Sequence, residues 1–328
     1  MNDLAGKNVL FIAPKFFDYD RDIFRELSRR GASVDLLRDR PFDSAAMVAL
    51  TRFARFTVMP AVERHYSAEL ERLGRSHYDL VFVINGQTLP LRLLRTLRTS
   101  FANARFVLYM WDSIGNRPST LRHIHYFDHV FTFDRRDADE YGLKFRPLFY
   151  SQDFDLPSSD FFQYDISFIG TAHSDRVKVV SDIDRSLPVN TRCFWHLYLQ
   201  APWVLYAYIL TNSHFRSADL RHISFASMAK SDVQTIMAGS RGILDIEHPQ
   251  QRGLTMRTFE TIGASKKLVT TNRDVESYDF YHPSNILVVD REAAKIPKCF
   301  FECDYVPIEP ALKHRYSLAG WIEEILEL

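Results

Sequence analysis

Short runs of apolar, β-branched and aromatic residues recur along this chain, and longer amphipathic segments separate them. Near-continuous apolar strands that alternate with helices are typical of a parallel sheet covered on both faces. In the first half, we predict helices at 20–30, at 89–99 and over a long region, 44–73, that is interrupted at Pro60. The predicted strands of this half are 7–14, 32–37, 78–85, 105–111 and 129–133.

The same alternation restarts after a polar, proline-containing stretch at 150–163. The predicted strands are 164–170, 191–197, 222–225, 241–247, 267–271 and 285–290, with helices that include 231–238 and 256–263. A chain of 328 residues has the length of two domains. We therefore predict an α/β protein with two Rossmann-like, doubly wound domains that face each other across a cleft. The predicted domains are 1–150 and 164–328, joined by a linker at 151–163, and the last helix is expected to pack back on the first domain.

Composition excludes several classes of function. The 41 Lys and Arg residues balance 41 Asp and Glu residues, whereas a polynucleotide-binding protein usually has a basic excess, so we expect no nucleic-acid partner. Three cysteines and the absence of a recognisable signal peptide favour a cytoplasmic location. The most apolar stretch, 194–210, contains His196, Gln200 and Pro202. These residues favour a buried or interfacial element over a membrane span, and contact with a membrane surface stays open.

Ligands of doubly wound sheets bind at the carboxyl ends of the strands, so the loops that follow the predicted strands hold the candidate site residues. The most informative loop precedes the helix predicted at 256–263. Gly253 and Thr255 stand ahead of this helix, and Arg257 and Glu260 lie in its first turns. A glycine loop that leads into a helix N-terminus suits a phosphate or diphosphate, with Arg257 as a bidentate partner and Glu260 as an acceptor for ribose hydroxyls. An ordinary α/β connection with a solvated Arg and Glu fits the same spacing, since the chain has no GxGxxG or GxxxxGK[ST] motif.

The block RGLTMRTFETIGASKKLVTTN, followed by YDFYHPSNILVVDR, resembles the donor-binding half of bacterial GT-B glycosyltransferases. The similarity is greatest to the CgeB-like group and to the glycosyltransferase family 1 and 4-like enzymes of capsule and lipopolysaccharide synthesis. YMWDS and FDHVFTFD in the first half resemble that group less specifically. The resemblance implies a GT-B fold, with an amino-terminal domain for the acceptor and a carboxyl-terminal domain for a nucleotide sugar.

The resemblance also assigns roles to individual residues. Glu260 falls where the second glutamate of the retaining family 4 motif contacts ribose, whereas Arg252 stands where the first glutamate belongs, and this departure weakens the stereochemical assignment. The expected diphosphate-binding residues are Gly170, Thr171, Arg176, Gly253, Leu254, Thr255 and Arg257. His173, His248 and Tyr281 are expected to contact the sugar or the base, and Asn85, Gly86 and Gln87 to lie on the acceptor side.

Asp112 ends an apolar strand of the first half and is the expected catalytic residue, as a base or an orienting group for the acceptor hydroxyl. Its alternative role is that of a helix cap, because Asp-Ser is a good capping pair. We expect no metal and no cofactor beyond the nucleotide sugar. Asp182 and Asp184 fit a solvated helix face better than a metal-binding pair, and His123 and His125 lack further ligands.

The aromatic residues Tyr278, Phe280 and Tyr281 suit either core packing or contact with the apolar face of a sugar. Residues 45–65 mix apolar side chains with Arg52 and Arg55, and this pattern fits either an anionic membrane surface or a buried helix with snorkelling arginines. We thus expect a cytoplasmic hexosyltransferase-type enzyme that moves a sugar to a cell-envelope glycan or lipid-linked saccharide, and whether it works at the inner face of the membrane stays open. Transfer is expected to be metal-independent, with retention slightly favoured. The alternatives are a GT-B-fold nucleotide-sugar epimerase and a non-catalytic glycan-binding or assembly protein.

Overall fold

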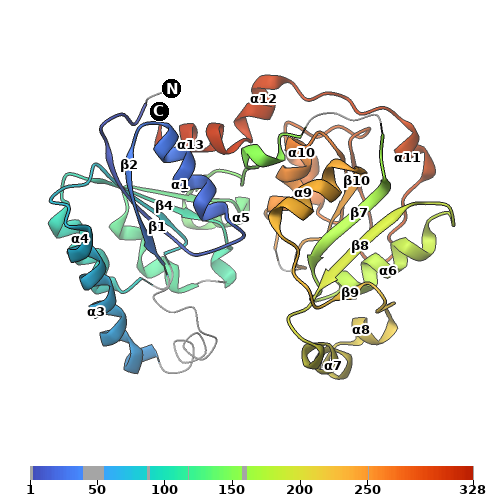
Figure 1. Cartoon of the computed structure of the whole chain (residues 1–328), viewed down its shortest axis with the longest axis horizontal. Coiled ribbons are helices and arrows are strands. Elements are labelled where there is room, and N and C mark those ends of the chain that lie inside the picture. The colour runs from blue at the N-terminus through green and yellow to red at the C-terminus, as the bar shows by residue number, and fades with distance from the viewer. Residues whose placement is uncertain are drawn as a thin grey trace. The chain divides into compact units, whose positions relative to one another are not determined.

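The computed structural model describes residues 3–39, 55–86, 89–116, 118–156, 161–249 and 251–327, with the side chains of all of these except 55–61. The chain forms two compact units (Figure 1). Unit 1 comprises Met1–Pro147 together with Trp321–Leu328, and unit 2 comprises Leu148–Gly320. The boundary therefore lies before the predicted linker, and the last residues of the chain belong to unit 1.

Unit 1 is built on a six-stranded parallel sheet with the order β2-β1-β3-β4-β5-β6. Its strands are β1 (Asn8–Ala13), β2 (Ser33–Arg38), β3 (Leu80–Ile84), β4 (Arg105–Met110), β5 (His129–Thr132) and β6 (Lys144–Phe145). The helices include α1 (Tyr19–Arg29), α3 (Arg55–Leu73), α4 (Leu91–Ser100) and α5 (Arg135–Tyr141). Because β2 and β3 lie on opposite sides of β1, the order of the strands reverses between β1 and β3.

Helix α3 continues through Pro60, where the sequence predicts an interruption. Pro60 is the sixth residue of α3, so the helix lacks one backbone hydrogen bond there and still continues. The rest of the region predicted as helical, including Arg52, lies outside the described residues. The proposed membrane-facing side chains, Arg55 among them, lie outside the described side chains as well.

The last helix, α13 (Leu318–Leu326), closes unit 1. Trp321 is fully buried, and its ring lies 4.7 Å from that of Tyr109 on β4 and 5.9 Å from that of Phe82 on β3. The fully buried guanidinium of Arg30 joins Glu26 of α1, Asp3 and Glu323 of α13, at N–O distances of 2.7 to 2.8 Å. Both contacts join distant parts of the sequence, so unit 1 is complete only when the end of the chain has folded onto it.

Unit 2 repeats the architecture with a different strand order, β12-β11-β10-β7-β8-β9, and all its pairs are parallel. Its strands are β7 (Tyr164–Thr171), β8 (Cys193–Tyr198), β9 (Ile223–Ser224), β10 (Ser240–Asp245), β11 (Lys267–Thr270) and β12 (Ile286–Val288). Its helices include α6 (Arg176–Ser186), α7 (Pro202–Thr211), α8 (Ser213–Ser217), α9 (Lys230–Ala238), α10 (Met256–Gly263), α11 (Lys298–Glu302) and α12 (Pro310–Arg315). The predicted class of two doubly wound parallel α/β units is confirmed.

An aromatic cluster packs behind α10. Phe259 of this helix contacts Tyr278, Phe280 and Tyr316, with ring centroids 5.6 to 6.4 Å apart. Tyr278 and Phe280 are both buried, which confirms core packing for these two aromatic residues. Gly263 ends α10 beside the Tyr150 ring, where a Cβ atom would lie 2.5 Å from Cδ2 of that ring. Close packing, rather than a left-handed turn, therefore requires glycine at this position.

Candidate functional site

The strand order of unit 2 reverses between β7 and β10, and this is where doubly wound sheets bind ligands. The loop after β7 runs toward α6 on one side, and the loop after β10 runs toward α10 on the other (Figure 1). The two loops, together with the end of β7 and the first turns of α6 and α10, contain all of the residues predicted for the donor site except Tyr281. The structure therefore brings together residues that lie about 80 positions apart in the sequence.

Arg176 is the first residue of α6 and lies at this switch point. Its Nε donates to the carbonyl oxygen of Ile246, 2.7 Å away, and its Nη1 donates to that of Thr171, 3.3 Å away. Burial lowers the pKa of Arg176, and the negative charges of Asp245 and Glu247 oppose this effect. In the described part of the chain, no carboxylate forms an ion pair with this guanidinium. A desolvated cation that only carbonyl oxygens hold in place is suited to bind an anion.

Gly170 and the start of α6 leave space around this guanidinium. A Cβ atom on Gly170 would lie 3.4 Å from Nη1 of Arg176 and 2.9 Å from Cζ of Phe168. Any side chain at this position would crowd the aromatic ring and the arginine together. Glycine therefore keeps the backbone of β7 close to the cation.

The N-terminus of α10 is fixed by a buried carboxylate that the sequence reasoning did not assign. Asp245, the last residue of β10, accepts hydrogen bonds from Oγ1 of Thr255 at 2.7 Å and from Oγ1 of Thr258 at 2.6 Å. Thr255 is also the N-cap, and its hydroxyl oxygen accepts from the backbone N–H of Thr258. The Thr255 hydroxyl is thus fully used inside the protein, and what this helix end offers to a ligand is its backbone N–H groups.

Arg257 and Glu260 pair with each other instead of facing a ligand independently. Nη1 of Arg257 lies 2.7 Å from Oε2 of Glu260, whose side chain is only 3% exposed, and it also contacts the sulfur of Met237 at 3.0 Å. The charge of Arg257 is therefore largely neutralised. A ribose hydroxyl reaches the Glu260 carboxylate only if this ion pair rearranges.

Two imidazole rings flank the switch point. His173 follows β7 and His248 follows β10, with ring centroids 5.5 Å apart. Burial, together with the positive charge of Arg176, lowers the pKa of His173 to about 4. The His173 ring is neutral at pH 7 as a result, and it can donate or accept a hydrogen bond without adding charge.

Arg291 is a residue of this region that the sequence reasoning missed. It lies just after β12, and its guanidinium donates to both carboxylate oxygens of Asp175 at 2.8 Å. It also donates to the Glu247 carboxylate, which in turn accepts from Thr271 Oγ1 at 2.5 Å. Burial raises the pKa of Glu247, although Thr271 and Arg291 partly oppose this effect. One arginine thus joins the loops that follow β7, β10 and β11. The rule that functional residues follow the carboxyl ends of the strands, applied to β12, would have pointed to Arg291.

Asn272, the last residue of the Thr-Thr-Asn sequence, forms hydrogen bonds with the backbone of the segment that contains Gly253, ahead of α10. Its Nδ2 donates to the carbonyl oxygens of Arg252 at 2.9 Å and of Gly253 at 3.5 Å. Gly253 and Leu254 are buried, whereas the side chain of Arg252 is exposed. These hydrogen bonds fix the backbone at Arg252 and Gly253, just ahead of α10.

Tyr281 is the one predicted donor-side residue that does not follow a carboxyl end. It lies shortly before Ile286, which begins β12, so it is close to the amino end of that strand.

In unit 1, Asn85 and Asp112 follow neighbouring strands at the carboxyl edge. Asn85 has a φ of 61°, and its Oδ1 accepts from the backbone N–H of Trp111 at 3.0 Å. Oδ1 of Asp112 accepts from Nδ2 of Asn116 at 3.2 Å, while the N–H of Ile114 donates to Asp137. Gly86 completes the turn after β3, and Gln87 lies outside the described residues.

Exposed aromatic rings lie at the same edge. Phe16 and Phe17 follow β1 and are 42% and 71% exposed. The rings of Phe16 and Trp111 are 5.5 Å apart. Trp111 directly precedes Asp112 in the sequence, and apolar surface of this kind suits the apolar face of a sugar ring.

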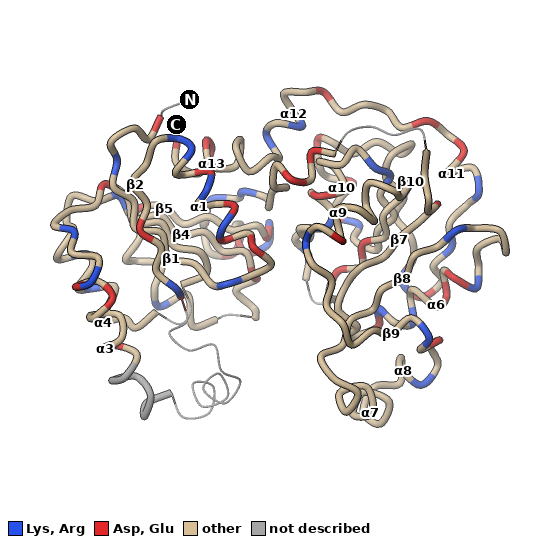
Figure 2. The backbone as a smooth tube through the Cα atoms, viewed as in Figure 1, with Lys and Arg blue, Asp and Glu red and all other residues tan. Residues whose placement is uncertain are grey.

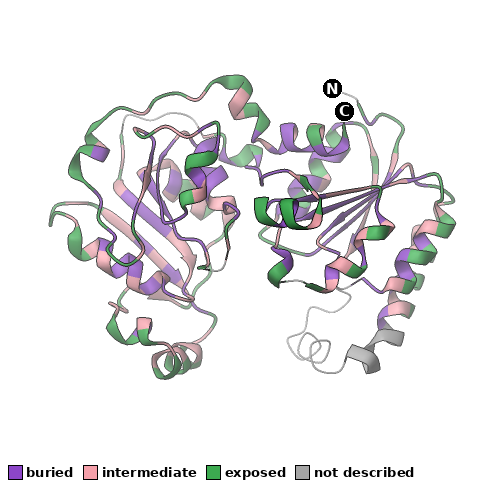
Figure 3. Cartoon of the chain, turned by 180° about the vertical axis from the view of Figure 1, so that it is seen from behind, coloured by how far each residue is buried: buried purple, intermediate pink, exposed green. Residues whose placement is uncertain are grey.

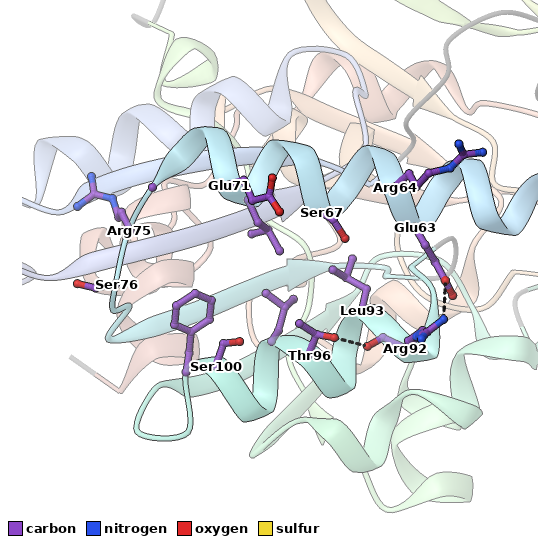
Figure 4. Close-up of a pocket in the computed structure, with 14 residues that line it drawn as sticks. Glu63, Arg64, Ser67, Glu71, Arg75, Ser76, Arg92, Leu93, Thr96 and Ser100 are labelled. Atoms are coloured by element: carbon purple, nitrogen blue, oxygen red, sulfur yellow. Dashed lines mark hydrogen bonds and ion pairs between the residues drawn. The ribbon is translucent and has the colours of Figure 1, made fainter.

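A groove of about 800 Å³ lies elsewhere in unit 1, between α3 and α4 (Figure 4). Leu70, Leu93, Leu97 and Phe101 contribute apolar surface to its lining, and the charges of Glu63 and Arg92 approach each other to 3.5 Å. No predicted site residue lines this groove.

Among the residues that the structure describes, no group of three His, Cys, Asp or Glu side chains is arranged to hold a metal ion. Asp182 pairs with Lys178 and Arg185 on α6. Asp184 accepts from the Trp195 indole N–H at 2.7 Å. These two aspartates therefore serve the packing and surface of α6. The helices of the described ranges include none that is long and apolar enough to cross a membrane.

No protein-family model and no curated protein matches the sequence. Solved structures do match. HepE (Alr3699) of Anabaena, in complex with UDP and glucose or with UDP-glucose, superposes with TM-scores of 0.58 and 0.60 at 12% identity, over 98% of both chains. A glycosyltransferase of Rickettsia africae gives 0.55 at 12% identity, over 98% of this chain and 97% of the other. MnaA of S. aureus, solved with UDP, gives 0.52 at 10% identity, over 98% and 95% of the two chains.

These similarities extend over nearly the whole chain, and at such low identity they bear on the fold alone. The matched part of this chain includes both of its parallel six-stranded sheets. The chain therefore has the two-domain α/β fold known as GT-B.

Proposed function

We propose that this protein is a glycosyltransferase whose unit 2 binds a nucleotide diphosphate sugar. The observation that carries the proposal is Arg176, a desolvated cation without an ion-pair partner among the described residues, at the switch point of a doubly wound sheet. A diphosphate would satisfy its charge, and the adjacent N-terminus of α10 would contribute backbone N–H donors. The presence of UDP in the HepE and MnaA structures supports UDP as the first nucleotide to test.

The remaining donor contacts follow from the same geometry. The backbone of Gly170, Thr171, Gly253 and Leu254 would surround the diphosphate, together with Thr255 at the helix end. Arg257 would move from Glu260 to a phosphate oxygen, and the released Glu260 carboxylate would accept from ribose hydroxyls. Neutral His173 and its neighbour His248 would contact the sugar or the base.

Unit 1 would bind the acceptor at the carboxyl edge of its sheet. Asp112 would orient or deprotonate the acceptor hydroxyl, and Asn85 and Gly86 would shape the turn beside it. The exposed rings of Phe16 and Phe17 support a saccharide acceptor. With the resemblance to capsule and lipopolysaccharide enzymes, they support an envelope glycan or a lipid-linked saccharide at the inner face of the membrane.

Transfer would break the bond between the anomeric carbon and the diphosphate oxygen and form a bond to the acceptor oxygen. Arg176 and the α10 N-terminus would stabilise the charge that develops on the departing diphosphate, without a metal ion. In an inverting reaction the acceptor proton passes to Asp112. In a retaining reaction, which the resemblance slightly favours, it passes to the departing diphosphate while Asp112 orients the hydroxyl.

A thermal-shift screen against UDP, GDP, dTDP and CMP, each alone and as a sugar conjugate, tests the donor site. A ligand at a hundredfold excess over its Kd raises the free energy of unfolding by about 2.7 kcal/mol. Binding of none of the three diphosphates, UDP, GDP and dTDP, would refute the proposal, and binding of CMP alone would contradict a diphosphate donor. Conversion of the sugar without an acceptor would instead indicate an epimerase, and binding without turnover on any saccharide would indicate a non-catalytic protein. Activity that EDTA removes and a divalent ion restores would refute the metal-free mechanism.

A further inference from the structure

Helix α7 carries apolar side chains all round, yet none of its residues is fully buried. Val204, Leu205, Tyr208 and Ile209 pack against the core of unit 2. The Tyr208 ring stacks on that of Phe215 in α8, with centroids 4.8 Å apart. This inner face already attaches the helix to the domain.

The opposite face is uncovered. Trp203, Tyr206 and Leu210 are 72%, 68% and 78% exposed, and with Ala207 they follow the i, i+3, i+4, i+7 spacing of one helix side. We call these four residues the outer face of α7. Figure 3, which views the chain from behind, shows the helix without a buried residue. A helix that is apolar on both sides normally has both sides buried, so the outer face calls for a partner.

The charges around α7 indicate what kind of partner this is. From position 185 to position 218 the sequence contains no Asp or Glu, and Figure 2 shows α7 without a charged residue of either sign. Arg216 of α8 caps the end of α7 by donating to the carbonyl oxygens of Ile209 and Leu210. Within the described ranges this arginine forms no ion pair, so it leaves a net positive charge at the end of the outer face.

We propose that the outer face of α7 inserts into the headgroup region of an anionic lipid bilayer, with Arg216 against the lipid phosphates. Trp and Tyr prefer this interface because their rings are amphipathic, and Leu210 adds a purely apolar contact. A helix of ten residues is about 15 Å long, which suits a helix that lies in the surface of a membrane and does not cross it. Three large side chains are too few for a stable dimer interface, which needs roughly 20 residues from each partner. The inference rests on the proposed function for its cellular setting, since an envelope acceptor is presented at such a surface.

Vesicle co-sedimentation of the full-length protein tests the inference. We expect binding to vesicles that mix phosphatidylcholine and phosphatidylglycerol, and much weaker binding to phosphatidylcholine alone. Leu210→Ser and Tyr206→Ser should each lower the partition coefficient about tenfold. Arg216→Gln should lower it about fivefold, on the anionic vesicles only. Phe161→Ser is the matched control, because it removes an aromatic residue of unit 2 that is also 78% exposed but lies outside α7.

Tryptophan fluorescence gives a second readout. Binding should shift the Trp203 emission to the blue, and Trp203→Phe should abolish the shift while it preserves most of the binding. Equal binding by wild type, Leu210→Ser and Phe161→Ser would refute the inference. So would a concentration-dependent dimer that Leu210→Ser dissociates, because a second copy would then cover the face. UDP binding, measured in parallel, separates the two proposals. The α7 variants should bind UDP as wild type does. If wild type itself does not bind UDP, only the donor-site proposal is refuted.

Discussion

Replacement of Arg176 by glutamine separates a ligand-binding role from a structural one. Glutamine removes the positive charge and keeps one N–H donor for the carbonyl oxygen of Ile246 or Thr171. Burial lowers the pKa of Arg176, which means that the folded protein loses free energy of hydration when it holds this charge. The glutamine variant does not have this loss. This gain offsets the hydrogen bond that is lost, so we expect the free energy of unfolding of the unliganded protein to change by less than about 1 kcal/mol.

The effect on nucleotide binding should be much larger. A hydrogen bond between a guanidinium and a phosphate contributes about 1.5 to 3 kcal/mol, so the Kd for UDP should rise by about 10- to 100-fold. At a UDP concentration that is a hundredfold above the wild-type Kd, the stabilisation of about 2.7 kcal/mol would fall to about 0.4 kcal/mol for a hundredfold weaker variant. For a domain of this size, the shift in melting temperature should fall from about 5–11 °C to about 1–2 °C.

Calorimetric titration with UDP, in the absence of any acceptor, measures the Kd directly. The matched control is Arg185→Gln in the last turn of the same helix, where Arg185 is exposed and pairs with Asp182. The control should bind UDP as wild type does. An unchanged Kd in Arg176→Gln, or an equal loss in the control, would refute the assignment of Arg176 to the diphosphate.

Four further substitutions, the first of them in a pH series, test the rest of the structure. The folded-state pKa of His173, about 4, is below its unfolded value, so this residue alone should lower stability by about 2 kcal/mol from pH 7 to pH 5, and His173→Gln should remove that part of the dependence in urea denaturation. Glu260→Ala should abolish the preference for UDP over 2′-deoxy-UDP in calorimetry; a preference that persists would exclude Glu260 from the ribose. Asp112→Asn should lower kcat by at least about a hundredfold with an unchanged melting temperature. Full activity of this variant would mean that Asp112 has only a structural role. Trp321→Ala should destabilise unit 1 by about 3 to 5 kcal/mol in denaturant, whereas a small effect would contradict its full burial.

The fold class could be predicted from the sequence because apolar strands and amphipathic helices have local patterns. The helix at Met256–Gly263 and the strands near 105–110 and 164–171 lie within one residue of the expected bounds. The helix through Pro60 was not predicted, because a proline tells which bond is missing but not whether the surrounding packing tolerates the loss.

Much of the candidate donor site was also accessible from the sequence. The rule that ligands bind after the strands pointed to Arg176, His173 and His248, and the structure groups these residues at one switch point. The rule did not reveal the partners of each charge. Arg257 and Arg176 look equivalent in the sequence, but Glu260 neutralises the first.

The sequence by itself determined two doubly wound domains, the loops that carry the polar residues, and a composition without a basic excess. Only the tertiary structure decided which cations are compensated, that Arg291 joins three loops, and that α7 exposes one apolar face. The reason is physical: hydrophobic periodicity is a local property of the chain, whereas ion pairing and burial depend on which distant segments the fold brings within a few ångströms of each other.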